Sequence, residues 1–202
     1  PMLLKRHRAP QTNAAPLRHT AMALQQSVEA LSIPRHFYAQ RPANRAIAQH
    51  LGERFTALGY RVRQQGSLHN LVAQAPSTTA PRILVCAHYD SVPNTFGADD
   101  NASGLAVMLE VARRTAGLDQ IAYVAFNGEE DNLAGSRQYV AALENEAWRP
   151  ESVHVLESVG YVSHAADSQQ TFVSLPFLPT VGDFIGLVAN HQSASLASEV
   201  LC

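Results

Sequence analysis

The stretch Ile83-Leu84-Val85-Cys86-Ala87-His88 decides the fold, because it is a short apolar run that ends in a polar residue. An apolar run of this length without alternation is typical of a central strand that is buried on both faces of a sheet. Comparable runs occur at Ile121 to Phe126 and at Val153 to Leu156. We therefore predict three central strands at these places.

The regions around these strands carry helical periodicity and turn signals. Apolar residues recur at spacings of three and four, which is the pattern of an amphipathic helix. The helices predicted in this way run from Leu17 to about Leu31, from Ala43 to Leu58, from near Ser103, over 134 to 145, and from Asp183 to about Val200. Two further strands are predicted over Tyr60 to Gln65 and Asn70 to Ala75. The alternation predicts an α/β fold, a three-layer sandwich with a mostly parallel central sheet flanked by helices.

The length of 202 residues is sufficient for one domain with its own core. We expect an irregular N-terminal segment over residues 1–16 and a single α/β domain over residues 17–202, incomplete at its C-terminus. Cys86 and Cys202 are the two cysteines, and the first lies within an apolar strand, so no disulfide framework is expected.

Charge and hydropathy exclude several classes of partner. The formal net charge is −2, and this balance implies neither nucleic acid nor an anionic membrane surface as a partner. No run of 18 or more apolar residues occurs, so no membrane span is expected. No signal peptide is visible, and a chain that does not begin with Met leaves the compartment open between the cytoplasm and a secreted or periplasmic location.

Histidine and acidic residues gather where the three central strands end. The carboxyl ends of strands in an open α/β sheet meet at one edge, so residues distant in sequence are expected to converge there. The residues that follow the three strands in this way are His88, Asp90, Asp99, Asp100, Glu129, Glu130 and Glu157. A mixed set of histidine and carboxylate ligands favours Zn²⁺, with Mn²⁺ or Co²⁺ as substitutes.

Each of these patterns has an ordinary structural explanation when it stands alone. A single His-x-Asp is common, and acidic residues ahead of a helix act as caps. Together, however, carboxylates crowded at one buried edge repel one another unless a cation holds them. His88 and Asp90 point the same way in an extended chain, so Asp90 is suited to orient the imidazole.

Four ordered motifs resemble peptidase family M28, a family of zinc-dependent aminopeptidases and other exopeptidases. The motifs are Val85-Cys86-Ala87-His88-Tyr89-Asp90-Ser91, Gly97-Ala98-Asp99-Asp100-Asn101-Ala102-Ser103-Gly104, Phe126-Asn127-Gly128-Glu129-Glu130 and Leu156-Glu157-Ser158-Val159-Gly160-Tyr161. Four motifs in order at sensible spacing are a specific signal, unlike any one of them alone. The resemblance covers roughly residues 17 to 190.

The resemblance implies a site with two zinc ions. His88 and Glu157 are expected to hold one ion and Glu130 the other, while Asp100 bridges the two ions. The peptide bond from Asp100 to Asn101 is expected to be cis, as it is in relatives. Glu129 is expected to be the general base that activates the metal-bound water, and Asp90 to orient His88. The substrate implied is a peptide with a free N-terminus.

One departure from the family pattern concerns the last ligand, a histidine in a Ser-Asp-His-like segment. No such segment occurs after Glu157, and we interpret His164 and His191 as surface or loop histidines. We therefore expect the chain to stop before that ligand.

Two alternative functions stay open at this point. One is a glutaminyl cyclase, a relative with one zinc ion that performs intramolecular acyl transfer. The other is a non-catalytic M28-like binding domain. The intact Asp100-to-Gly104 segment favours the peptidase over the first, and retention of the acidic set favours an enzyme over the second. The sequence leaves the side-chain preference, the exopeptidase direction and the oligomeric state open.

Overall fold

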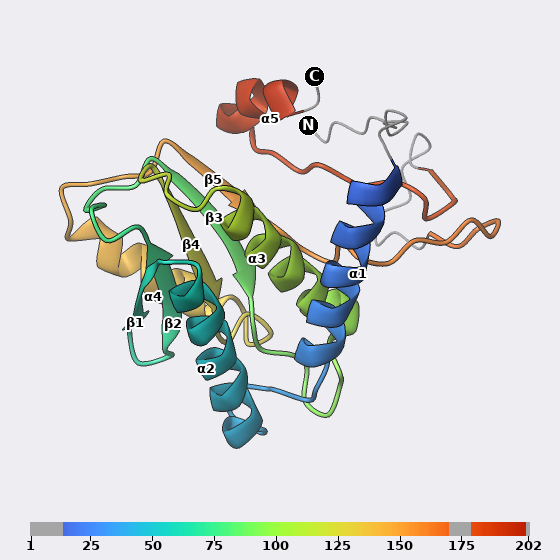
Figure 1. The fold of residues 1–202 in the computed structure, drawn as a ribbon, viewed down its shortest axis with the longest axis horizontal. Helices are drawn as coiled ribbons and strands as arrows, with labels where there is room; N and C mark the ends of the chain where they lie inside the picture. The colour runs from blue at the N-terminus through green and yellow to red at the C-terminus, as the bar shows by residue number, and fades with distance from the viewer. Residues whose placement is uncertain (1–13, 170–178, 201–202) are drawn as a thin grey trace. The chain divides into compact units, whose positions relative to one another are not determined.

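The computed structural model describes residues 14–169 and 179–200 of the chain (Figure 1). The chain divides into two compact units, of which one comprises residues 15–160 and the other residues 161–202 together with the first 14. The first unit carries the sheet and its helices. In the second, the described residues contain the 3₁₀ turn η2 (His191–Ser193) and helix α5 (Ala194–Val200). None of the helices in the described ranges is both long and apolar enough to cross a membrane.

The first unit is built on a five-stranded sheet with the order β1-β2-β4-β3-β5. The strands are β1 (Arg61–Gln65), β2 (Asn70–Gln74), β3 (Ile83–His88), β4 (Ile121–Phe126) and β5 (Ser152–Val155). All five lie where strands were predicted, to within one or two residues at each end. The predicted third central strand, β5, however, pairs only with β3 within the described sheet and so forms its edge.

The sheet is mixed, whereas a mostly parallel one was expected. β3 runs parallel to both β4 and β5, but β2 pairs antiparallel with β1 and with β4. The reason lies in the short connection from β1 to β2, where Gly66 and His69 both adopt positive φ angles, of 73° and 61°. A connection this short joins two strands only as an antiparallel hairpin.

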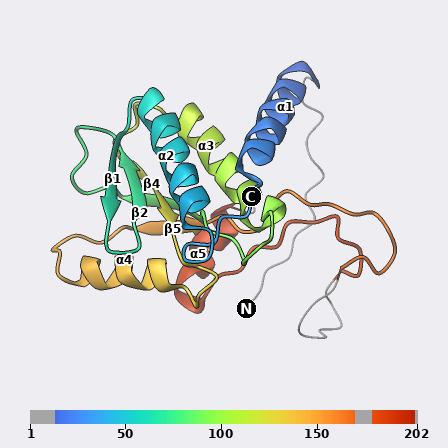
Figure 2. The ribbon, with the colours of Figure 1, turned by 90° about the horizontal axis from the view of Figure 1, so that it is seen from below.

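Helices cover both faces of the sheet, so the predicted three-layer α/β architecture is confirmed. The helices are α1 (Ala14–Leu31), α2 (Arg41–Ala57), α3 (Gly104–Arg114) and α4 (Ala134–Glu144). Figure 2 shows α2 and α3 on one side of the sheet and α4 on the other. Gly59 follows α2 with a φ of 89°, the left-handed conformation of a residue that ends a helix.

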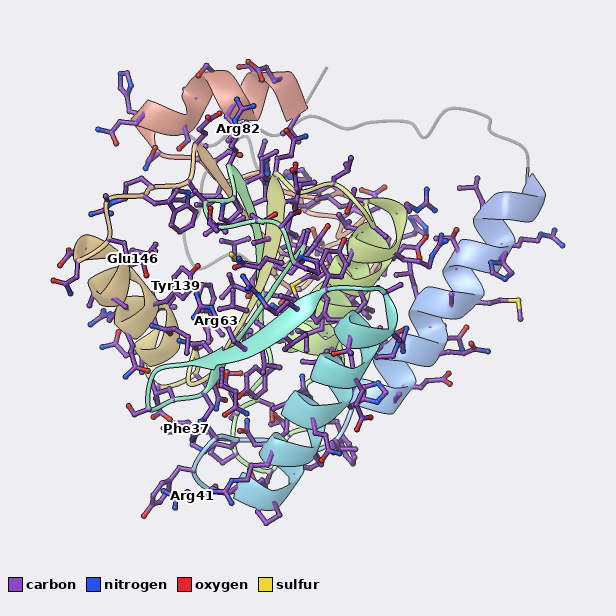
Figure 3. All side chains as sticks on the ribbon, turned by 60° about the vertical axis from the view of Figure 1, so that its left-hand side comes forward. Phe37, Arg41, Arg63, Arg82, Tyr139 and Glu146 are labelled. Carbon is purple, nitrogen blue, oxygen red and sulfur yellow. The ribbon has the colours of Figure 1, made fainter. Side chains whose placement is uncertain are left out.

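The two faces of the sheet form separate hydrophobic clusters because successive strand residues point to opposite sides. In β4, Tyr123 packs with α2 and α3, whereas its neighbour Val124 packs with α4. Tyr139 supplies much of the α4 side and lies between that helix and the sheet (Figure 3). Helix α3 turns the predicted apolar face inward, with Leu105 and Met108 both fully buried.

Cys86 lies in the middle of β3 and is fully buried, as predicted. Burial raises the pKa of its thiol to about 12, so the thiol is protonated at neutral pH. The apolar run that defines the fold therefore carries an inert thiol two residues before its terminal histidine.

Two predicted boundaries near the ends of the chain are wrong. Helix α1 begins at Ala14 rather than Leu17, and Pro16 fits its first turn because the N–H groups there need no helical partner. The helix predicted from Asp183 begins only at residue 194, after η2. The side chain of Asn190 accepts a hydrogen bond from the amide of Ser193 at 2.8 Å and so caps η2, the turn that leads into α5. Residues 1–13, which make up most of the segment expected to be irregular, lie outside the described residues.

Candidate metal centre

The strand ends that carry the acidic residues lie next to one another in the sheet. β3 is the parallel neighbour of both β4 and β5, and His88 at its end is paired with Phe126 of β4. Side chains that follow parallel neighbours emerge at the same sheet edge. The loops after these strands therefore bring Glu129, Glu130 and Glu157 towards His88.

His88 lies at the centre of the cluster, with its side chain only 2% exposed. Its Nε2 atom lies 2.9 Å from Oδ1 of Asp100 and 3.5 Å from Oε2 of Glu157. The same atom lies 3.9 Å from Oε2 of Glu129. Two groups of potential ligand atoms, each within 4.8 Å, share this histidine: one includes Glu129 and Glu130, the other Asp100 and Glu157.

Asp90 lies beneath this cluster and is completely buried. Its Oδ1 atom is 3.4 Å from Nδ1 of His88, a contact without the alignment of a hydrogen bond, so the interaction is electrostatic. Its two oxygens instead accept hydrogen bonds from the backbone amides of Glu129, at 3.1 Å, and Glu130, at 3.2 Å. The orientation of His88 by Asp90 stays a prediction, whereas the sequence did not indicate these two amide contacts, through which Asp90 fixes the loop after β4.

Asp100 lies in a wide turn, Ala98–Ser103, that leads into α3. The peptide bond from Asp100 to Asn101 is cis, as the family resemblance implied. Asn101 is fully buried, and its side-chain amide donates to the carbonyl of Leu156 at 2.8 Å. Its Oδ1 accepts from the amide of Gly104 at 3.1 Å, so Asn101 ties this turn to the end of β5.

The start of this turn depends on a glycine. Gly97 adopts a φ of 55°, in the left-handed region that residues with a Cβ avoid. A Cβ at this position would lie 2.6 Å from the carbonyl oxygen of Asp100 and 2.9 Å from Cβ of Ser91. Close approach of the backbone to Asp100 therefore requires glycine.

Glu157 is held through both of its carboxylate oxygens. Oε1 accepts from the hydroxyl of Ser158 at 3.0 Å, and Oε2 accepts from the side chain of Asn101 at 3.1 Å. The amide of Ser158 also donates to Oδ1 of Asn101 at 3.3 Å. Asp99 binds this loop as well, because its Oδ1 accepts from the amide of Gly160 at 2.8 Å. Asp99 thus has a structural contact, outside the two groups of potential ligands.

The adjacent glutamates resist ionisation in the absence of a cation. Burial, together with the neighbouring carboxylates, raises the pKa of Glu129 and of Glu130 above the usual range. Glu130 accepts a hydrogen bond from the amide of Val92 at 3.0 Å, which links the loop after β3 to the loop after β4.

His88 and Asp100 form a charged pair in the metal-free chain. Burial lowers the pKa of His88, but the carboxylates of Asp100, Asp90 and Glu157 outweigh burial and raise it to about 12. The hydrogen bond from His88 in turn holds the pKa of Asp100 below its usual range. A metal ion ligated by His88 would compete with a proton for the same nitrogen.

The cluster has the chemistry and the access that a divalent cation requires. One imidazole and several carboxylates form a donor set suited to zinc and to similar ions. The side chains of Asp100 and Glu157 are 54% and 49% exposed, so the cluster opens to solvent although His88 is buried. The residues present therefore fit a metal centre.

A network of buried asparagines supports the site and was not predicted. Asn44 of α2 and Asn127 after β4 exchange side-chain hydrogen bonds of 2.9 and 3.1 Å. The Oδ1 of Asn70 accepts from the backbone amide of Asn127 at 3.0 Å, and its Nδ2 donates to the carbonyl of Gly135 at 2.9 Å. These contacts fix the residues that immediately precede Gly128. No sequence pattern marks them, because an isolated asparagine looks the same in a loop.

His164 and His191 belong to the second compact unit, and the side chain of His164 is 81% exposed. Across the described residues, the groups that could hold a metal contain His88 as their single histidine.

Comparison with known proteins agrees with this geometry. The profile described as Peptidase family M28 matches residues 70–178, a range that includes all of the clustered residues. The chain belongs to this family.

Relatives extend the match beyond that range. Protein YfbL of Escherichia coli is 33% identical over 181 residues, which cover 76% of this M28 chain and 54% of YfbL. The aminopeptidase YwaD of Bacillus subtilis is 46% identical over 82 residues, which cover 39% of this chain and 18% of YwaD. The chain thus matches about half the length of YfbL and a smaller part of YwaD.

Solved structures share the M28 fold at low sequence identity. LapB from Legionella pneumophila superposes with a TM-score of 0.62 at 23% identity, covering 81% of this chain and 52% of LapB. A glutaminyl cyclase from Tannerella forsythia has a TM-score of 0.58 at 22% identity, covering 78% of this chain and 65% of the cyclase. At these identities the likeness concerns the fold alone.

Proposed function

We propose that this protein is a zinc-dependent exopeptidase, an aminopeptidase that hydrolyses the N-terminal peptide bond of peptides. The observation that carries the proposal is the convergence of His88 with the carboxylates of Asp100, Glu129, Glu130 and Glu157. Membership of family M28 and local identity to a protein named as an aminopeptidase support it.

The ligands are assigned by their distances from His88. His88, Asp100 and Glu157 would hold one zinc ion, since their ligand atoms lie together. Glu130 would contribute to a second ion, as the family resemblance implies, and its potential ligand atom lies in a group with those of His88 and Glu129. When bound, zinc polarises the scissile carbonyl and stabilises the negative charge that develops on its oxygen. Mn²⁺ or Co²⁺ would suit the same donors.

Glu129 is the general base in this proposal. Its Oε2 lies within 3.9 Å of the imidazole nitrogen and faces the same cluster. Burial raises the pKa of its carboxyl, which brings the group closer to the pH at which a base both accepts and returns a proton. The carboxylate takes a proton from the attacking water and delivers it to the leaving amine.

Asp90 positions this base. Because it accepts the amide protons of Glu129 and Glu130 while facing His88, it fixes the base relative to the imidazole. Asp90 also provides negative charge next to the ring, which increases the basicity of a ligating histidine.

Glutaminyl cyclase is a second candidate, because a solved cyclase shares the fold. That likeness leaves the reaction undecided, and the number of bound metal ions separates the two candidates. One zinc ion per chain with conversion of an N-terminal glutamine to pyroglutamate would favour the cyclase.

The test combines zinc content with hydrolysis of aminoacyl p-nitroanilides that carry either a free or an acetylated amino group. We expect hydrolysis only of the free form, with loss of activity on chelation and recovery on addition of zinc. Glu129→Gln is the variant that tests the general base, because it keeps the shape of the side chain and leaves the assigned ligands in place. It should retain zinc while kcat falls by about 10²–10⁴. Absence of bound zinc, or unchanged kcat in the variant, would refute the proposal.

A further inference from the structure

The connector before α2 contains a fully buried arginine whose donors all meet backbone carbonyls. The Nε atom of Arg35 donates to the carbonyl of Tyr89 at 2.9 Å. Its Nη1 donates to the carbonyl of Phe96 at 2.7 Å, and its Nη2 to that of Gly97 at 2.9 Å. The backbone amide of Arg35 donates to Oγ of Ser91 at 3.1 Å. One side chain thus holds both ends of the loop between His88 and Asp100.

A buried guanidinium without a carboxylate in hydrogen-bond contact is unfavourable unless its donors are satisfied and its charge is balanced. The carbonyls satisfy the donors of Arg35. Burial opposes the charged form of the guanidinium, and the carboxylates of Asp90, Asp100 and Glu130 offset part of that cost at longer range. Arg35 therefore faces the acidic cluster from outside the ligand set.

The next residue, His36, contacts the loop after β4. The Nδ1 of His36 accepts hydrogen bonds from the backbone amides of Tyr38, at 3.3 Å, and Ala39, at 3.1 Å. The ring proton is therefore assigned to Nε2. That Nε2 lies 2.9 Å from Oδ2 of Asp131, the residue directly after Glu130. The side chain of His36 is 9% exposed and that of Asp131 is 52% exposed, so this contact is partly buried.

The connector is itself fixed to the scaffold. The side chain of Asn44 donates to the carbonyl of Arg35 at 2.8 Å and to Oδ1 of Asn127 at 2.9 Å. A Cβ added to Gly128 would contact the ring of Phe37 at 3.7 Å, so this ring packs next to the loop after β4. Figure 3 shows Phe37 beside the first turn of α2, where Arg41 begins the helix.

We propose that Arg35 and His36 are positioning residues for the metal centre, one holding the loop after β3 and the other the loop after β4. The pair keeps His88, Asp100 and Glu130 in register without contacting metal or substrate. As a statement about zinc it rests on the proposed function, but its effect on the loops exists in the metal-free protein. An arginine is required at the first position, because its three nitrogens reach separate carbonyls, whereas a lysine offers a single nitrogen.

The test measures hydrogen exchange and zinc affinity in Arg35→Lys and His36→Gln. In the metal-free protein, NMR would follow the amides that join the loops, those of Val92, Glu129 and Glu130. We expect these amides to exchange about tenfold faster in both variants, with unchanged exchange in β3 and β4. Zinc affinity, measured by competition with a chromophoric chelator, should fall about tenfold or more, as for other supporting partners of metal ligands.

Arg41→Lys is the matched control, because Arg41 is exposed and stacks on the ring of Tyr38 at 4.8 Å. It should behave as the unaltered protein does. Equal loop exchange in Arg35→Lys and Arg41→Lys would overturn the inference, as would an increase spread evenly over the core strands. If the unaltered protein binds no zinc, the proposed function fails, while the exchange data still decide the role of Arg35 and His36.

Discussion

The two sides of the metal centre are built differently. The core loops, residues 89–97 and 128–132, rest on charged groups with no solvent exposure, namely Asp90 and Arg35. The edge loop, residues 156–160, follows the four-residue strand β5, whose residues alternate between half-buried and exposed. Its ligand Glu157 is half exposed and accepts hydrogen bonds from the neutral side chains of Asn101 and Ser158. We infer that the buried charges hold the core loops more firmly than the exposed, neutral hydrogen bonds hold the edge loop.

The largest expected effect comes from removing Asp90, the buried carboxylate that supports the core loops. Asp90→Ala leaves the buried amide donors of Glu129 and Glu130 without their acceptor and should lower the free energy of unfolding by about 3 kcal/mol. Glu157→Ala, the matched change in the edge loop, should lower it by less than about 1 kcal/mol, since the side chain is half exposed. Urea unfolding of the metal-free variants measures both. Equal losses would contradict the distinction between the two sides.

A second prediction concerns the backbone of the core loops. Gly97→Ala introduces a Cβ within 2.6 Å of a backbone carbonyl and should destabilise by about 2–3 kcal/mol. Gly117 also has a positive φ, of 90°, but a Cβ there meets nothing within 4 Å. Gly117→Ala should therefore carry only the conformational penalty of about 1 kcal/mol. Thermal unfolding of the pair separates steric contact from backbone strain, and similar melting temperatures would argue against the close approach.

The edge loop should show its effect in metal binding rather than in stability. Ser158→Ala removes the hydroxyl that donates to Oε1 of Glu157. We expect the zinc affinity to fall by up to about tenfold. The free energy of unfolding should change by less than about 0.5 kcal/mol, because the contact is exposed. Chelator competition and urea unfolding on the same sample would test this. A stability loss that matches the affinity loss would place this loop with the core loops.

The smallest effect lies away from both loops, on α3. Hydrogen bonds from Arg113, together with those from Arg114, lower the pKa of Glu110 to about 2, although burial opposes the shift. A carboxyl with a lowered pKa stabilises the fold above its ordinary pKa of 4.5, and that contribution is lost as the pH falls towards 2. Glu110→Gln should cost about 0.5 kcal/mol at pH 7 and progressively less below pH about 4. Unfolding curves across this pH range would measure the difference, and a constant difference would rule out the ion pairs as its source.

Sequence reasoning predicted the convergence of the cluster because apolar strands and the acidic residues after them are visible in one dimension. It also placed the end of α2 to within one residue, since Leu58 was predicted and Ala57 is observed. Other features carry no such pattern. Arg35 and Asp90 act through backbone carbonyls and amides, and any residue supplies those groups, so their partners leave no mark in the sequence.

The wrong boundaries have the same origin. The helix predicted from Asp183 starts only at residue 194, after the short turn η2, which the side chain of Asn190 caps. The sheet became mixed because one short hairpin reversed β2, although β2 has the apolar character of a central strand. Such local contacts outweigh periodicity, which reports only the average environment of a segment.

The buried, protonated thiol of Cys86 makes its rate of alkylation a measure of how often the sheet opens. Alkylating reagents react with thiolates, so this cysteine is modified only when β3 leaves the core and the thiol meets water. In a Cys202→Ser background, the rate of modification would report how often the strand beneath His88 opens. A ligand that binds the closed form would slow this alkylation in proportion to its occupancy. The reaction of the Cys86 sulfur would then report binding without any contact between that atom and the ligand.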